Sequence, residues 1–183
     1  MTVAEPHVEV EERADGVLHL MSPLPIEQSN QSLANLFFKW CDRYQSRVVI
    51  AEKTISGEFV GLTYRDACLQ ARAIAAQLIA LGGGQDTPLM MLSGASRAHF
   101  VLSWGAMLAG VPYVPVSANY ATVPAAFGKL KALFEKTQPR FVWSEDYNLQ
   151  RQGLIDTGLA EKPLIWLGVD APGKAIALNF ESN

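Results

Sequence analysis

The chain has 183 residues, of which 49% are hydrophobic and 18% are charged. This length suits one domain or slightly more, and the apolar fraction is enough to bury a core, which excludes a mainly disordered protein. The 15 basic and 18 acidic side chains give a formal net charge of −3. So small a charge argues against binding of nucleic acid or of an anionic membrane through a basic face.

The amino-terminal stretch is acidic, and we interpret it as a solvated tail or exposed hairpin rather than a functional patch. Residues 8–11 alternate apolar and charged side chains, Asp15 and Gly16 favour a turn, and a second apolar stretch follows at 17–20, which predicts a β-hairpin. We therefore assign residues 1–28 to an acidic hairpin and connector, and residues 29–183 to an α/β subdomain.

The cysteine content and the apolar stretches indicate a cytoplasmic protein. Cys41 and Cys68 are too few for a disulfide framework, which favours a reducing compartment. The sequence begins without the basic and apolar regions of a signal peptide. Its most apolar stretch, 98–116, is interrupted by glycines and prolines, so we expect a helix, a turn and a strand there rather than a membrane span.

The predicted elements begin with a helix that starts near Ser29 or Asn30. Its apolar face is expected to hold four residues, Leu33, Phe37, Trp40 and Tyr44. Two strands that pair with each other follow at 48–52 and 59–64.

From residue 65 onward, helices and strands alternate. Helices are expected at 65–81, between Ser96 and Gly110, at 123–136 and at 148–159, and strands at 88–92, 111–116, 140–144, 163–169 and in the apolar run 175–180. The face of the second of these helices is expected to bury Phe100, Val101, Trp104 and Leu108, and all four tryptophans are interpreted as packing residues. The alternation predicts an α/β fold with a mainly parallel sheet that carries helices on both faces. The strand at 111–116 contains two prolines, so we expect it to lie at a sheet edge or to have the prolines at its start.

Three motifs could carry chemistry, and each has a simpler structural interpretation. The segment Gly168–Ala175 matches seven positions of a P-loop, but Ala175 replaces the hydroxyl residue and no helix follows, so we interpret it as a Pro-Gly turn. Gly82–Gly84 follows a predicted helix and is read as its end. Ser93–Ser96 could hold an anion at a helix N-terminus, but capping by Ser96 explains the motif alone, and we favour that structural interpretation.

The three histidines, at positions 7, 19 and 99, lack cysteine or carboxylate companions at ligand spacing. No nucleophile motif is present either. The residues alone therefore assign no catalytic, cofactor-binding or metal-binding position.

The chain nevertheless resembles a known family in the order and spacing of several segments. The segments Leu62–Asp66, before an Ala-rich helix, and Met107–Ser117 are similar to the first two sequence blocks of the adenylate-forming superfamily. Four further segments resemble the feruloyl-CoA synthetase branch: Pro23–Pro25, Ser93–Ser96, Val114–Tyr120 and Phe127–Leu130. The resemblance covers roughly Ser22 to Ala177. Two places, Ala118 and Ala121–Thr122, depart from the pattern of that branch.

The resemblance implies a three-layer fold that is part of the large N-terminal domain of adenylate-forming enzymes. It implies an acyl-CoA synthetase that uses ATP, Mg²⁺ and CoA to activate a small carboxylic acid, aromatic and feruloyl-like, through an acyl-adenylate. The family's catalytic motifs come after the matched region, so no catalytic residue is carried over. We expect the chain to be truncated before those motifs, to need the remainder of the same polypeptide, and to be inactive and free of bound cofactor alone. The sequence leaves open whether the protein forms a homodimer.

Two other hypotheses compete with a fragment of such an enzyme. One is a stand-alone binding or scaffold module that reuses the fold without catalysis. The other is an unrelated doubly wound domain with a ligand at the carboxyl ends of its strands, which a crevice filled by the chain's own loops would favour.

Overall fold

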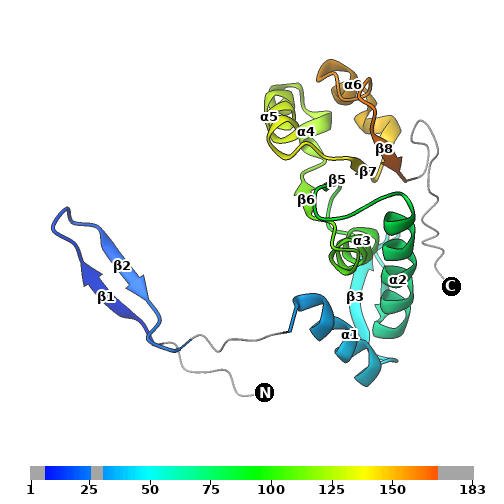
Figure 1. Cartoon of the computed structure of the whole chain (residues 1–183). Coiled ribbons are helices and arrows are strands. Elements are labelled where there is room, and N and C mark those ends of the chain that lie inside the picture. The colour runs from blue at the N-terminus through cyan, green and yellow to red at the C-terminus, as the bar shows by residue number, and fades with distance from the viewer. Residues whose placement is uncertain (1–6, 26–30, 169–183) are drawn as a thin grey trace. The chain divides into compact units, whose positions relative to one another are not determined.

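The computed structural model describes residues 7–25 and 31–168 and divides the chain into two units, Met1–Ser32 and Leu33–Asn183. The first unit contains an antiparallel hairpin of β1 (Glu9–Glu12) and β2 (Leu18–Met21) (Figure 1). Gly16 adopts a positive φ of 78° in the turn, a conformation that glycine tolerates without strain. The predicted hairpin is therefore confirmed. Val10 lies opposite Leu20, and both side chains are exposed.

The second unit opens with α1 (Leu33–Arg43), whose predicted apolar face is wrong in part. The helix buries Ala34, Phe37, Phe38 and Cys41, whereas Leu33 is 62% and Trp40 is 48% exposed. The sequence offers two adjacent apolar stripes on this helix, and packing against neighbouring helices selects the one through Phe38 and Cys41. The predicted start at residues 29–30 lies outside the described residues.

Helix α1 is followed by β3 (Val48–Lys53) and β4 (Phe59–Thr63), which pair antiparallel as predicted. Then comes α2 (Tyr64–Ala80), which Thr63 caps by accepting a hydrogen bond from the backbone N–H of Asp66. Gly82 ends this helix with a φ of 77°, which confirms that the glycine run terminates a helix.

The predicted alternation continues through β5 (Leu89–Leu92), α3 (Arg97–Leu108) and β6 (Tyr113–Val116). The next elements are α4 (Asn119–Thr122), a 3₁₀ turn η1 (Pro124–Ala126), α5 (Phe127–Thr137), β7 (Phe141–Ser144), α6 (Tyr147–Asp156) and β8 (Ile165–Leu167). The predicted helix 123–136 is thus divided, with a separate 3₁₀ turn that has a proline in its first turn. The predicted strand at 175–180 lies outside the described residues.

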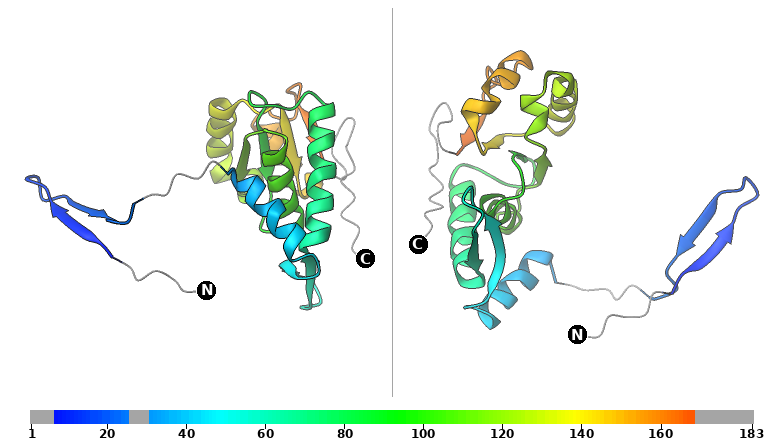
Figure 2. Two further views of the ribbon diagram at one scale, coloured as in Figure 1. Left: turned by 60° about the horizontal axis from the view of Figure 1, so that its bottom comes forward. Right: turned by 180° about the vertical axis from the view of Figure 1, so that it is seen from behind.

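Strands β5 to β8 form a parallel sheet in the order β6-β5-β7-β8, which places β6 at an edge as predicted. Leu89 and Met91 of β5 point to one face, where they join the core under α1, α2 and α3. Met90 and Leu92 point to the other face, where they join the core under α4, α5 and α6. Figures 1 and 2 show these two helical layers on either side of the sheet. The fold is therefore the predicted three-layer α/β arrangement.

The buried face of α3 also differs from the prediction. Val101 is buried as expected, but Phe100 and Trp104 are half-buried and Leu108 is 37% exposed. The helix instead buries Leu102, Gly105 and Ala106. The reason is close packing of α3 on α2, because a Cβ on Gly105 would lie 2.5 Å from a methyl carbon of Ile74.

The prediction that the tryptophans are packing residues is likewise confirmed only in part. Trp143 and Trp166 on strands β7 and β8 are 4% exposed, as expected for packing residues, whereas Trp40 lies at the surface. In the two described ranges, none of the helices combines the length and apolar character needed to span a bilayer.

Candidate functional site

The order of the strands places a topological switch point between β5 and β7, and the region at their carboxyl ends, around Gly94 and Glu145, is called the crevice below. The chain passes from β5 through α3 to β6 on one side, and β7 pairs with the other side of β5. Helix α3 lies on one face of the sheet, and α6, which follows β7, lies on the other. The connections after β5 and β7 thus leave in opposite directions, and ligands of open parallel sheets bind at such a point.

A carboxylate of the chain itself bridges this crevice. The backbone N–H of Gly94, after β5, donates to Oε2 of Glu145, after β7, over 3.0 Å. Deeper in the crevice, the hydroxyl of Ser144 donates to Oε1 of Gln150 over 2.7 Å. The Gln150 amide in turn donates to the backbone carbonyl of Leu92 over 3.0 Å. Since Gln150 is 1% exposed, these bonds tie the two strand ends together out of contact with water.

A second polar pair lies beside the bridge. The hydroxyl of Ser93, 6% exposed, is 2.7 Å from Nδ1 of His99 in the first turn of α3. Burial lowers the pKa of His99 below its ordinary value of 6.5, and the charge of Glu145 opposes this shift in part. At neutral pH the ring is therefore mostly uncharged, and one of its nitrogens can accept a hydrogen bond. The pair can hold or pass a proton at the mouth of the crevice.

The segment Ser93–Ser96, where an anion could have been held, is already supplied with carboxylates. Ser96 caps α3 by accepting a hydrogen bond from the backbone N–H of His99, which confirms the capping role. The backbone N–H and Nε of Arg97 both donate to Oε2 of Glu52, over 3.0 and 3.3 Å. Together with Glu145 on Gly94, these contacts place two negative charges at the positive end of the helix. A bound anion would have to displace them.

The remaining candidate motifs are the histidines and the P-loop-like segment. His7 and His19 belong to the hairpin unit, and only His99 lies at the sheet. Across residues 7–25 and 31–168, no three His, Cys, Asp or Glu side chains are grouped as metal ligands would be. Gly168 directly follows β8 with a φ of 120°, and the rest of the P-loop-like segment lies outside the described residues.

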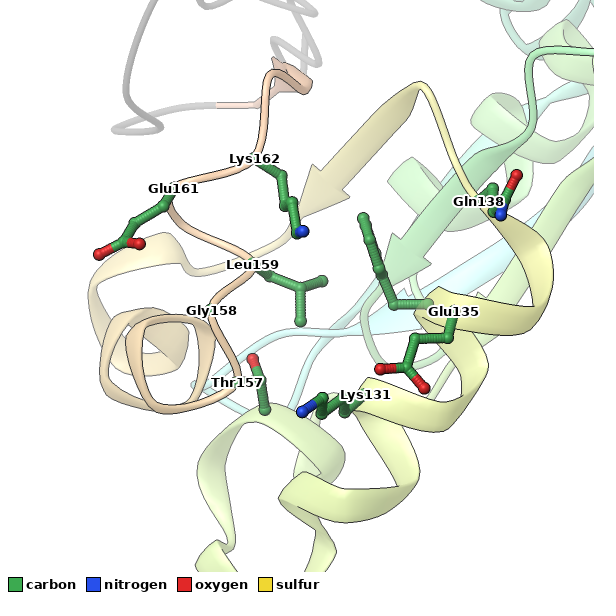
Figure 3. Close-up of a pocket in the computed structure, with 9 residues that line it drawn as sticks. Lys131, Glu135, Gln138, Thr157, Gly158, Leu159, Glu161 and Lys162 are labelled. Atoms are coloured by element: carbon green, nitrogen blue, oxygen red, sulfur yellow. The ribbon is translucent and has the colours of Figure 1, made fainter.

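A different cavity, of about 660 Å³, lies at the opposite edge of the sheet. It is bounded by the end of α5 and by the connection from α6 to β8, at the amino ends of β7 and β8. Figure 3 shows Lys131 and Lys162 directed into this space and Glu161 directed away from it. The lining combines two lysines with two glutamates. Its position is at the edge where parallel α/β sheets do not bind their ligands.

Sequence reasoning missed the two residues that organise the crevice. Glu145 stands directly after a buried strand, where polar residues gather at the carboxyl edge of a parallel sheet. Gln150 lies on the same face of α6 as Tyr147 and Leu154, both buried. A polar side chain at an apolar position of a helix is the signal that predicts a buried hydrogen-bond network.

The sequence matches the AMP-binding enzyme family over residues 37–169, which is more than half of the chain. The chain belongs to the AMP-binding enzyme family. The family match overturns the hypothesis of an unrelated doubly wound domain. No match is found among curated proteins.

Several solved structures share the fold of this member of the AMP-binding enzyme family. A fatty acid AMP ligase from Legionella pneumophila has a TM-score of 0.59 and 18% identity over 66% of this chain and 20% of that one. The adenylation domain of a carboxylate reductase from Mycobacterium chelonae has a TM-score of 0.60 and 22% identity over 78% and 24% of the two chains. A luciferase-like enzyme from the mealworm Zophobas morio has a TM-score of 0.62 and 14% identity over 75% and 30%. The chain thus spans less than a third of the length of these three structures.

Proposed function

We propose that the chain is the amino-terminal part of an AMP-forming acyl-CoA synthetase. The observation that carries this proposal is the family match over residues 37–169, on a parallel sheet whose strand order has a switch point between β5 and β7. A structural neighbour, the fatty acyl-adenylate ligase of L. pneumophila, is described in complex with acyl adenylate and pyrophosphate. The same partial reaction is proposed for the enzyme to which this chain contributes.

The proposed reaction has two steps. A carboxylate oxygen of the acid attacks the α-phosphorus of ATP, and the bond to the bridging oxygen of pyrophosphate breaks, which yields the acyl-adenylate and pyrophosphate. The thiolate of CoA then attacks the acyl carbon, and AMP leaves with the electrons of the broken C–O bond, which yields the thioester. Negative charge develops on phosphate oxygens in the first step and requires cationic or hydrogen-bonding partners.

The described crevice cannot supply those partners by itself. Glu145 adds negative charge there, burial keeps His99 mostly uncharged, and Arg97 is already paired with Glu52. The role proposed for this part of the enzyme is therefore to shape one wall of the site and hold its loops, while the rest of the polypeptide binds ATP, Mg²⁺ and CoA. On this proposal the 183-residue chain alone has no adenylation activity.

The proposed substrate is an aromatic, feruloyl-like acid. The support is the resemblance of Val114–Tyr120 and Phe127–Leu130 to the feruloyl-CoA synthetase branch. The first segment covers the carboxyl end of β6 and the start of α4, beside the crevice.

Two measurements test the proposal in sequence. The reading frame in the source genome is expected to continue beyond Asn183 into a Ser/Thr/Gly-rich loop that ends in lysine. The protein encoded by that frame is expected to exchange labelled pyrophosphate into ATP when ferulate is added, and to form a thioester when CoA follows. The 183-residue chain is the matched control and is expected to remain at the level of a heat-treated sample. A stop codon after Asn183 would instead favour a binding or scaffold module, and exchange with aliphatic acids only would overturn the aromatic substrate.

A further inference from the structure

The two cysteines of the chain lie together in the core beneath α1, α2 and α3. Cys41 is in the last turn of α1, and Cys68 is in the second turn of α2. Both thiols are free, and the two residues are 2% and 8% exposed. The thiol of Cys41 forms a hydrogen bond with the sulfur of Cys68, so the two sulfurs meet where the helices pack on each other. A covalent bond between them would join α1 to α2.

An arginine contacts one of the two sulfurs. The Nε–H of Arg72, one turn after Cys68 on α2, donates to Sγ of Cys68 over 3.3 Å. The guanidinium carbon of the same arginine lies 4.8 Å from the centroid of the Phe38 ring on α1, so the cation spans both helices. Arg72 is an exposed residue, and its contact with Cys68 therefore lies where the core meets solvent. Reactive cysteines occur in such electropositive surroundings near the surface.

The two thiols differ in their surroundings. Burial, the neighbouring Cys68 and the charge of Asp42 raise the pKa of Cys41 to about 12, and the charge of Arg72 opposes this shift in part. Cys41 therefore stays a thiol at neutral pH. Cys68, in contrast, accepts the hydrogen bond of the Arg72 cation. A thiolate is the reacting form of cysteine, and a cationic donor is the contact that favours it, so the pair combines an attacking cysteine with a resolving one.

We propose that Cys41 and Cys68 form a reversible disulfide when the protein reacts with hydrogen peroxide. The sulfur of Cys68 attacks one peroxide oxygen and the O–O bond breaks. The leaving hydroxide takes up the proton of the thiol as water, which yields the sulfenic acid of Cys68. The sulfur of Cys41 then attacks the sulfur of Cys68, the S–O bond breaks, and a second water carries away the proton of Cys41. The two sulfurs lose two electrons, and the peroxide gains them.

The disulfide would tie α1 to α2 on one face of the sheet. Helix α6, which carries Gln150 of the crevice, packs on the other face. Oxidation of the cysteines and activation of an acid therefore involve different groups, and each proposal can fail without the other. A cross-link restricts the unfolded chain more than the folded one, so the oxidised chain is expected to unfold at a higher urea concentration than the reduced chain. In a reducing compartment such a bond is transient, because thiols reverse it.

The test is the oxidation of the folded 183-residue chain with hydrogen peroxide, followed by mass spectrometry of its unreduced peptides. A pair of peptides linked through Cys41 and Cys68 is expected, with the loss of two hydrogen atoms and with both thiols recovered after treatment with dithiothreitol. Two free thiols at a peroxide concentration that oxidises free cysteine would overturn the proposal. Disulfides between different chains only, seen on a non-reducing gel, would overturn it as well.

Variants assign the roles of the two cysteines. In Cys41→Ala, dimedone is expected to trap a sulfenic acid on Cys68, whereas in Cys68→Ala the remaining thiol is expected to react many times more slowly. Where an alanine variant does not fold, competitive labelling of both thiols in the unchanged chain makes the same comparison. Faster reaction of Cys41 than of Cys68 would refute the assigned order of attack.

A further variant tests the arginine. Arg72→Gln removes the cation beside Cys68 and is expected to slow disulfide formation several-fold, because less of the attacking sulfur is then a thiolate. The matched control is Arg65→Gln, at an exposed position of the same helix, which is expected to leave the rate unchanged. Urea titration of the reduced variants shows whether each is folded. Equal rates in the two folded variants would show that Arg72 does not activate Cys68.

Discussion

The two edges of the parallel sheet are built in different ways. At the carboxyl edge, the connections after β5 and β7 are joined by Gly94 with Glu145 and by the buried Gln150. At the amino edge, a cavity of about 660 Å³ stays open, and the charged side chains that surround it are exposed. This cavity is therefore not at the edge where the strand order predicts a ligand. Strand order and cavity volume therefore point to different edges, and the proposed site follows the strand order.

The largest effect on the free energy of unfolding is expected from removal of the Gln150 side chain. Gln150→Ala leaves the hydroxyl of Ser144 and the carbonyl of Leu92 without their partner and creates a cavity at a position that is 1% exposed. The expected loss in the free energy of unfolding is about 2–4 kcal/mol, measured by urea titration. A loss below 1 kcal/mol would show that the buried network does not hold this edge together.

A smaller effect is expected at the surface of the same crevice. Glu145→Gln keeps an acceptor near the N–H of Gly94 but removes the negative charge, whereas Glu145→Ala removes both. Because Glu145 is exposed, the alanine variant is expected to lose about 1 kcal/mol in the free energy of unfolding and the glutamine variant less. Glu161→Ala, at an exposed position of the amino edge, is the matched control and is expected to change little. Equal losses in Glu145→Ala and Glu161→Ala would contradict the difference between the edges.

The pH dependence of stability tests the carboxyl edge through His99. Burial lowers the pKa of His99 in the folded chain, so the unfolded chain binds more protons there as the pH falls below 6.5. The fold is therefore expected to lose stability through this residue on acidification below that pH, and to regain it as the pH rises. His99→Asn, which preserves an acceptor for Ser93, is expected to reduce the slope between pH 7.5 and pH 5.5 in urea titrations. An unchanged slope would show that His99 titrates as it does in the unfolded chain.

Much of the fold could be predicted because local signals agree with it. The apolar runs at β5 and β7, the cap at Ser96 and the prolines near β6 all point to a parallel sheet with covered faces. The buried faces of α1 and α3 could not be predicted in full, since each helix has more apolar residues than its neighbours can cover. Trp40 and Leu108 satisfy the helical spacing but lie at the surface.

The candidate site was less accessible to sequence reasoning. Gly94 and Glu145 are 51 residues apart, and only the placement of β7 beside β5 brings them together. The pattern of apolar residues determines that strands and helices exist, but it does not determine their order within the sheet. Gln150 could have been recognised by its polar side chain on the buried face of α6. Glu145 gave no signal beyond its position after a strand.

The smallest effect is expected at the amino edge. Lys131→Ala and Lys162→Ala remove exposed charges that point into the open cavity, and neither lysine forms a salt bridge with any residue of the described ranges. Each is expected to change the free energy of unfolding by no more than about 0.5 kcal/mol, since exposed charges away from buried networks contribute little. Urea titration of both variants beside Gln150→Ala measures the contrast directly. A loss in either lysine variant as large as that in Gln150→Ala would mean that the cavity is a structural element of the sheet, and the two edges would then differ in shape but not in their contribution to the fold.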